Sequence, residues 1–272
     1  MGIKRKVGLA LSGGAARGLA HVGVLAVLEK EGIPIDMIAG TSIGAIIGAF
    51  YAQGKDIEQI EKAVMGLSRR KIMSLVDLTL PRTGFIKGKR MKDWLKSVIG
   101  EVDFEDLKIP FACVATDINT GEEVIIKQGS VVEAVRASVS IPVIFTPAKW
   151  QGRYLVDGGI VDPVPVRVLK QMGADFTIAV NVLDYTSNRT QQASTENVGD
   201  VKQPNIFSIL IRMISIMGYR AAISGIKEAD ITITPNVGHI RPSNFHRARE
   251  CILRGHRAAR HAIPEIKRQL EA

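Results

Sequence analysis

The serine between two glycines, Ser42, is the most conspicuous candidate for chemistry in this chain. It lies in Gly40-Thr41-Ser42-Ile43-Gly44, after a strand-like segment and before a helix-compatible one. A sharp turn from strand to helix crowds the positions two before and two after the turn residue, and glycine removes the side chains that would clash there. The pattern therefore predicts an exposed nucleophile, with the positive end of the next helix beneath its oxygen. The alternative is a packing turn in which Ser42 only caps the helix.

A glycine-rich loop, with Gly13, Gly14 and Gly18, follows the first strand-like segment and precedes a helix. Such a loop presents backbone N–H groups to an anion. A dinucleotide site would need an acid at the end of the second strand, and a P-loop would need its lysine and hydroxyl, but the sequence has neither. The oxyanion of an acyl-transfer intermediate fits better, and each amide aimed at it contributes ~3–4 kcal/mol.

A nucleophilic serine needs a base, and Asp157 is the most conspicuous acid. It ends a strand-like segment and is followed by Gly158 and Gly159. The alternative reading of Asp-Gly is an Asx turn between strand and helix. A histidine could also serve, since His239 would complete a triad in the order Ser, Asp, His, and His21 follows the glycine-rich loop.

Strand-like and helix-like segments alternate along the chain, as in a mostly parallel sheet. Gly32, Asp56 with Gln59, and Ser130 with Glu133 mark helix ends. We therefore expect an α/β fold with three layers and helices on both faces of the sheet. The expected strands lie near Val7–Leu11, Met37–Ala39, Pro110–Ala115, Val124–Lys127, Tyr154–Val156, Phe176–Asn181 and Ile231–Thr234.

Three ordered motifs give the chain a family resemblance. SGGAARG near the start, GTSIG and DGG occur in that order, and RASVSIPVIFTP at 136–147 and DGGIVDPVPV add to the match. The chain resembles a patatin-like phospholipase domain of the small bacterial kind over residues 7–172. We expect 7–172 to form the core, and 173–272 to continue the same domain with a polar loop at 184–204 and a helical cap or tail.

The resemblance implies a lipid acyl hydrolase of the esterase or phospholipase A type, with a Ser-Asp dyad and neither metal nor cofactor. Ser42 would be the nucleophile and Asp157 the base. The oxyanion hole would be lined by the N–H groups of Gly13, Gly14 and Ala15, with Arg17 bracing the loop; the motif glycines are Gly18, Gly40, Gly44, Gly158 and Gly159. One departure is Ala15, where the family usually has glycine. The alternative function is a catalytically weak lipid-binding or regulatory module on the same fold.

Composition and charge bear on the partners. The 272 residues are 46% hydrophobic and 23% charged, with a net charge of +9, two cysteines and only 5% aromatic residues. No nucleic-acid motif accompanies the charge, so we expect a lipid or ester substrate and possible peripheral contact with an anionic membrane. The sparse cysteines favour a reducing compartment. We therefore expect a cytoplasmic location, with peripheral association at the inner membrane surface as the alternative. The sequence leaves the oligomeric state open. The basic residues of the C-terminal segment include Arg247, Arg249, Arg254, Arg257 and Arg260.

Two apolar segments raise the question of membrane insertion. Residues 37–54 carry no charge, but their polar residues and the role of their glycines in the serine turn argue against a spanning helix. Residues 205–219 are apolar nearly all round, interrupted by Arg212, and look too short to span. We expect this segment to be buried or to line an acyl site, with a lipid-contacting cap as the alternative.

Overall fold

The computed structural model describes residues 5–77, 86–183 and 206–271, so the polar loop predicted at 184–204 lies outside the described residues. The strands are β1 (Val7–Leu11), β2 (Met37–Thr41), β3 (Phe111–Asp117), β4 (Glu123–Ile126), β5 (Ala148–Trp150), β6 (Arg153–Asp157), β7 (Phe176–Val180) and β8 (Ile231–Ile233). The α-helices are α1 (Ala20–Lys30), α2 (Ile43–Ala52), α3 (Ile57–Met65), α4 (Arg69–Ser74), α5 (Lys89–Ile99), α6 (Val131–Ser138), α7 (Val166–Gln171), α9 (Ile206–Glu228) and α10 (Ala248–Glu271). Short 3-10 helices are η1 (Ala15–Leu19), η2 (Phe104–Asp106), η3 (Gly158–Ile160) and η4 (Phe245–Arg247).

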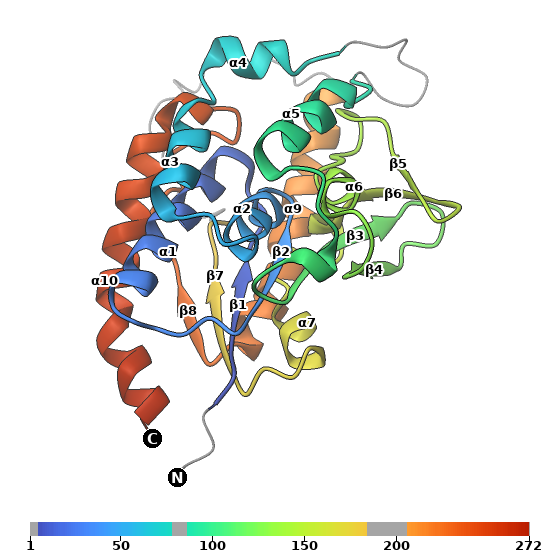
Figure 1. The fold of residues 1–272 in the computed structure, drawn as a ribbon. Coiled ribbons are helices and arrows are strands. Elements are labelled where there is room, and N and C mark those ends of the chain that lie inside the picture. The colour runs from blue at the N-terminus through green and yellow to red at the C-terminus, as the bar shows by residue number, and fades with distance from the viewer. Residues whose placement is uncertain (1–4, 78–85, 184–205, 272) are drawn as a thin grey trace, which may run out of the picture.

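One eight-stranded sheet runs through the molecule in the order β5-β6-β3-β2-β1-β7-β8, with β4 also paired to β3. The strands from β3 across to β8 are parallel, whereas β4, β5 and β6 pair antiparallel at the other edge (Figure 1). β7 and β8 come from beyond residue 172 and extend the same sheet. The predicted α/β fold with a mostly parallel sheet is confirmed.

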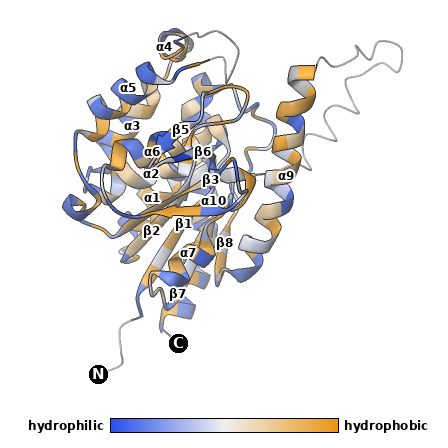
Figure 2. Ribbon diagram, turned by 90° about the vertical axis from the view of Figure 1, so that its right-hand side faces the viewer, coloured by the Kyte–Doolittle hydropathy of each residue, from blue (hydrophilic) through white to orange (hydrophobic). Residues whose placement is uncertain are grey.

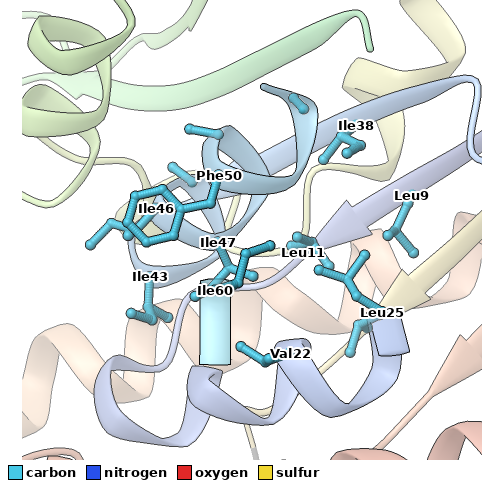
Figure 3. Close-up of a cluster of buried hydrophobic side chains, with 14 of the residues drawn as sticks. Leu9, Leu11, Val22, Leu25, Ile38, Ile43, Ile46, Ile47, Phe50 and Ile60 are labelled. Atoms are coloured by element: carbon cyan, nitrogen blue, oxygen red, sulfur yellow. The ribbon is translucent and has the colours of Figure 1, made fainter. Parts of the chain in front are cut away.

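Helices cover both faces of the sheet, as Figures 1 and 2 show. On one face, α1, α2, α6 and α10 enclose the larger apolar core, part of which appears in Figure 3, where Leu11 of β1 lies near Ile47 of α2 and Leu25 of α1. On the other face, α7 and α9 pack over Ala10, Ala39 and other small strand residues. Because both faces are covered, β1 and β2 are buried along their whole lengths.

The helix signals of the sequence gave mixed results. Asp56 caps α3 by accepting the N–H of Gln59 at 2.7 Å, as the pattern predicts. Gly32 follows α1 with φ of 68°, which suits a helix stop. Ser130 is the N-cap of α6, but its side chain makes no capping hydrogen bond, so the capping-box prediction was wrong in its bonding. Strand β5 was missed, since it has only three residues and none is fully buried.

The predicted burial of residues 205–219 was wrong. These residues begin a longer helix, α9, whose first half exposes most of its large apolar side chains. Only the second half packs closely on the core, where Gly218 and Gly225 face backbone carbonyls. In the described chain, Ile209–Glu228 is also the one helix long and apolar enough to cross a membrane by length and composition, so the judgement that this segment is too short did not hold. Residues 37–54, by contrast, hold β2 and the buried α2.

Candidate active site

Ser42 occupies a strained turn between β2 and α2. Its φ of 56° and ψ of −121° lie in a region that non-glycine residues rarely adopt. The flanking glycines are required by close packing, since a Cβ on Gly40 would lie 2.5 Å from the carbonyl oxygen of Gly44, and one on Gly44 would lie 2.1 Å from that of Leu11. The strand-turn-helix geometry predicted from the sequence is therefore present, and it has the form of a nucleophile elbow.

The Ser42 hydroxyl donates a hydrogen bond to Asp157 Oδ2, with an oxygen–oxygen distance of 2.6 Å. Asp157 ends β6, which is separated from β2 by β3. Its other carboxylate oxygen accepts the N–H of Gly159 at 2.8 Å. Gly158 lets the chain turn tightly over β3, because a Cβ there would lie 2.3 Å from the Val114 carbonyl oxygen. The two residues that sequence analysis selected separately thus form a hydrogen-bonded pair.

Burial changes the proton affinity of this pair. Ser42 and Asp157 are each only 7% exposed. Removal from water disfavours the carboxylate and raises the pKa of Asp157 to about 6, although the hydrogen bonds from Ser42 and Gly159 lower it. A carboxylate with a raised pKa is a better acceptor for a serine proton than an ordinary aspartate.

The glycine-rich loop lies beside Ser42, since a Cβ on Gly13 would lie 3.6 Å from the Cβ of Ser42. The N–H of Gly13 donates to Pro163 O at 3.0 Å, so this group is already engaged. Within the described chain, the N–H groups of Gly14 and Ala15 have no hydrogen-bond partner, as expected where helix η1 begins. Gly14 has φ of 144°, and Ala15 has φ of 50°, a left-handed conformation that favours the glycine usual in the family. The available donors are therefore Gly14 and Ala15 rather than the full set that the resemblance implies.

Arg17 fastens this loop to a distant segment of the chain. Its guanidinium is buried and donates from Nε to Ile240 O and from Nη2 to Gly238 O, both at 2.6 Å. The N–H of Ala16 also donates to Pro242 O at 3.0 Å. These bonds give Arg17 the bracing geometry that the resemblance implies. Gly18 lets η1 pack against α2, because a Cβ there would lie 2.1 Å from Ile43 Cγ2.

The two candidate histidines bond elsewhere. His239 Nε2 lies 2.7 Å from Glu250 Oε1. The other carboxylate oxygen of Glu250, Oε2, accepts a hydrogen bond from Arg247. His21 Nε2 lies 2.8 Å from Ser12 O, and burial lowers the pKa of this imidazole to about 4. The hydrogen bond of Asp157 to Ser42 therefore favours a dyad over a triad through either histidine. In the residues that the structure describes, no group of three or more His, Cys, Asp or Glu could hold a metal ion.

Ser138 is a functional candidate that sequence reasoning did not single out. Its hydroxyl accepts the backbone N–H of Ser42 at 2.9 Å and donates to Val114 O at 2.6 Å. It therefore fixes the elbow to β3 and engages the backbone N–H of Ser42. The signal was present in RASVSIPVIFTP, which contains Ser138, but no local pattern shows that this hydroxyl reaches Ser42.

Comparison with known proteins agrees with this geometry. The sequence model of the family described as Patatin-like phospholipase matches residues 9–170, which include the elbow, the glycine-rich loop and Asp157. This chain belongs to the patatin-like phospholipase family. The structure of VipD from Legionella pneumophila superposes with a TM-score of 0.65 at 16% identity, over 97% of this chain and 67% of that one. At that identity the likeness shows a shared fold.

Relatives of this patatin-like chain include longer proteins. An uncharacterized NTE family protein of Mycobacterium tuberculosis is 38% identical over 177 residues, 65% of this chain and 49% of the relative. The protein named lysophospholipase NTE1 in Lodderomyces elongisporus is 33% identical over 249 residues, 87% of this chain and 17% of the relative. The chain thus spans half or less of the length of these relatives.

Proposed function

We propose that this patatin-like chain is a lipid acyl hydrolase that cleaves carboxylic esters through a Ser42 acyl-enzyme, with Asp157 as the base. The hydrogen bond of 2.6 Å from Ser42 Oγ to Asp157 Oδ2 carries the proposal. The strained conformation of Ser42 and the nearby N–H groups of Gly14 and Ala15 support it. Family membership and relatives named lysophospholipases favour the same reaction class.

In the acylation step, Ser42 Oγ attacks the carbonyl carbon of the ester while its proton moves to Asp157. The carbonyl oxygen becomes an oxyanion, which the N–H groups of Gly14 and Ala15 stabilise. The carbon–oxygen bond to the leaving alcohol then breaks, and Asp157 returns the proton to that oxygen. The products are a free alcohol and an acyl group on Ser42.

In the deacylation step, Asp157 accepts a proton from water, and the water oxygen attacks the acyl carbon. The same donors hold the second oxyanion. The bond between Ser42 Oγ and the acyl carbon breaks, and the proton passes from Asp157 back to Ser42. A carboxylic acid leaves and the site is restored. No residue other than the dyad needs to exchange a proton in this cycle.

The first natural substrate to test is a lysophospholipid. This choice rests on the relatives named lysophospholipases, one of which matches over 87% of this chain. The chain covers only a small part of those proteins, so head-group and acyl-chain preference must be measured here. A panel of lysophosphatidylcholine, phosphatidylcholine, a monoglyceride and an acyl thioester separates the main ester classes.

Active-site labelling tests the proposed function directly. A fluorophosphonate probe should modify the wild-type chain, and mass spectrometry should place the modification on the peptide that contains Ser42. The Ser42→Ala variant should be neither labelled nor able to hydrolyse a short p-nitrophenyl ester, with an almost unchanged thermal midpoint. Labelling at another serine, or retained hydrolysis in the variant, would reject Ser42. A folded wild-type chain that neither reacts nor hydrolyses any ester would favour the lipid-binding alternative.

The proposed location is the cytoplasm, with peripheral contact at the inner membrane surface. The net charge of +9 favours attraction to anionic lipid. In α10, Arg249, Arg257 and Arg260 are exposed. Arg254 of α10 and Arg247 of the preceding η4 instead form ion pairs with Glu250. Electrostatic attraction through α10 therefore remains a prediction, and added salt should weaken it.

A further inference from the structure

The first half of α9 carries a continuous line of exposed apolar side chains, here called the α9 stripe. Spacings of three, four and seven residues place them on one side of the helix. Contiguous apolar surface of this kind marks an interaction site in a globular protein. The α9 stripe consists of Ile206, Ile209, Leu210, Met213, Ile216 and Met217.

The other side of α9 is fixed to the catalytic core. Gly218, Ala222 and Gly225 repeat at the same helical spacing, away from the stripe. A Cβ on Gly218 would lie 2.8 Å from the carbonyl oxygen of Gly159, and one on Gly225 would lie 2.4 Å from that of Val164. Gly159 is the residue whose N–H binds Asp157. On the side opposite the stripe, α9 is thus attached through a close backbone contact to the loop that holds Asp157, the proposed base.

The stripe extends toward the end of the sheet at which the active site lies. Ser42 and the glycine-rich loop follow the carboxyl ends of β2 and β1. In Figures 1 and 2, the start of α9 rises to that same end of the molecule, and α4 and the start of α5 lie at it as well. In Figure 2 the upper part of α9 stands apart from the other helices. A surface contacted by the stripe would therefore lie at the same end of the molecule as Ser42.

The charges around the stripe suit an anionic surface. No acidic residue occurs from Ile206 to Lys227, while Arg212 and Arg220 are exposed on the helix. At the same end of the molecule, exposed basic side chains lie on α4 and at the start of α5. Basic groups beside an apolar helix face are typical of proteins that lie in the interface of an anionic bilayer. The basic side chains on α4 and α5 are Arg70, Lys71, Lys89 and Arg90.

We infer that the α9 stripe inserts into the interfacial layer of an anionic phospholipid bilayer and presents the Ser42 site to the membrane surface. The free turns from 206 to 217 are about 18 Å long at 1.5 Å per residue, shorter than the ~30 Å hydrocarbon core. The remainder of the helix is docked on the protein, so α9 lies in the interface and does not span. This inference deepens the proposed function and depends on it only for what happens to the lipid after docking.

The preceding segment of the chain is a poor alternative occupant of the stripe. Residues 184–204 are rich in Ser, Thr, Gln and Asn, and such side chains gain little by covering isoleucine and methionine. A symmetric contact with a second copy through the stripe would gather four guanidinium groups, from Arg212 and Arg220 of each copy, around one apolar interface, where like charges repel. A bilayer with phosphate headgroups satisfies both the apolar and the basic parts of the surface.

Vesicle binding by the full chain tests the inference. Wild-type protein should co-sediment with vesicles of equal parts phosphatidylcholine and phosphatidylglycerol, and less with phosphatidylcholine alone. The double variant Met213→Gln, Met217→Gln should lose at least tenfold in partitioning while hydrolysing a soluble short-chain ester at the wild-type rate. Its matched control is Met65→Gln, Leu253→Gln, which alters side chains of similar exposure (45% and 51%, against 52% and 51%) outside the stripe and should bind like the wild type.

Three results would overturn the inference. The first is wild-type protein that stays in the supernatant, and the second is a stripe variant that binds as well as its control. The third is gel filtration in which the wild type is a dimer that the stripe variant converts to a monomer, since that would assign the stripe to a second copy. Ser42→Ala should still bind vesicles. Vesicle binding without any ester hydrolysis by the wild type would defeat the proposed function and leave the docking surface standing.

Discussion

The hydroxyl of Ser138 connects the backbone N–H of Ser42 to the carbonyl of Val114, with distances of 2.9 and 2.6 Å. This one side chain both accepts from the nucleophile's turn and donates to β3. It holds the Ser42 backbone at φ of 56° without touching the proposed reacting atoms. Ser138 is accordingly a positioning residue.

Ser138→Ala should lower kcat more than it raises KM. The substitution leaves a buried N–H without its acceptor, which costs about 1–3 kcal/mol of stability and loosens the turn that aims Ser42. We expect a loss in kcat of tenfold or more, measured with a short p-nitrophenyl ester. Ser97→Ala is the control, since that hydroxyl bonds only to Trp94 O on α5. Equal effects on kcat in the two variants would remove Ser138 from the site.

Asp157→Asn should inactivate the protein and stabilise it at neutral pH. Folding raises the pKa of this carboxyl from 3.8 to about 6, so the folded state binds the proton more tightly than the unfolded chain. The contribution of Asp157 to stability therefore falls as pH rises from about 4 to about 6, by about 3 kcal/mol at most. The amide of the Asp157→Asn variant does not ionise, so the variant does not lose this stability as pH rises. In thermal unfolding, the variant should have a higher midpoint than the wild type at pH 7 but not at pH 4. A higher midpoint at pH 4 as well would contradict the assignment.

The value of kcat/KM should rise with the ionisation of Asp157, with a midpoint near pH 6, and should level off roughly one pH unit above it. A midpoint there does not by itself separate a carboxyl from an imidazole, whose usual pKa is about 6.5. The temperature dependence of the midpoint does separate them, because the ionisation enthalpy of a carboxyl is near zero and that of an imidazole is large. We expect a midpoint that stays constant with temperature. Asp162→Asn should leave it in place, although burial and the neighbouring Glu123 raise the pKa of Asp162 to about 7.

His239→Ala should keep activity within about tenfold, a barrier change of ~1.4 kcal/mol. The imidazole contacts Glu250, so its loss affects packing and one part-buried hydrogen bond. His21 is buried, and His21→Gln retains an N–H that can reach Ser12 O. This variant too should stay within tenfold. A folded histidine variant as inactive as Ser42→Ala would restore the triad and reduce Asp157 to orienting an imidazole.

Ala15→Gly should stabilise the protein slightly while retaining activity. The left-handed conformation at φ of 50° costs alanine about 1–2 kcal/mol, and glycine adopts it freely. Part of the gain is offset because glycine makes the unfolded chain more flexible. We expect a net gain below about 1 kcal/mol in chemical denaturation, with an unchanged kcat/KM. A clear loss of stability would mean that the Ala15 methyl contributes packing that outweighs its strain.

Local sequence patterns predicted the parts of the site that local geometry determines. GTSIG specifies a crowded turn because only glycine fits two positions before and two positions after Ser42. The alternation of strands and helices predicts the layers. Spacing could not show that Asp157 reaches Ser42, because that contact depends on the order of β2, β3 and β6 in the sheet. The resemblance to the family supplied the pairing instead.

The exposure of α9 could not be read from its composition. A segment that is apolar nearly all round predicts a buried helix, but the large apolar side chains in the first half of α9 are exposed. Gly218 and Gly225 determine which half of α9 packs on the core. Their missing side chains let the second half approach the core closely, while the first half extends past it. The sequence could not predict the hydrogen bond of the Gly13 N–H either. Its acceptor is the carbonyl of Pro163, which lies far away in the sequence.

The 115 residues that separate Ser42 from Asp157 have a consequence for how the protein folds. The elbow can form from neighbouring residues, but its partner arrives only after β6 has paired with β3, a contact that must close a long stretch of chain. Catalytic competence is therefore a property of the completed sheet rather than of any early folding unit. During refolding, the proposed hydrolase activity should return no earlier than the slowest structural phase, so that a partly assembled chain would not yet cleave lipid esters.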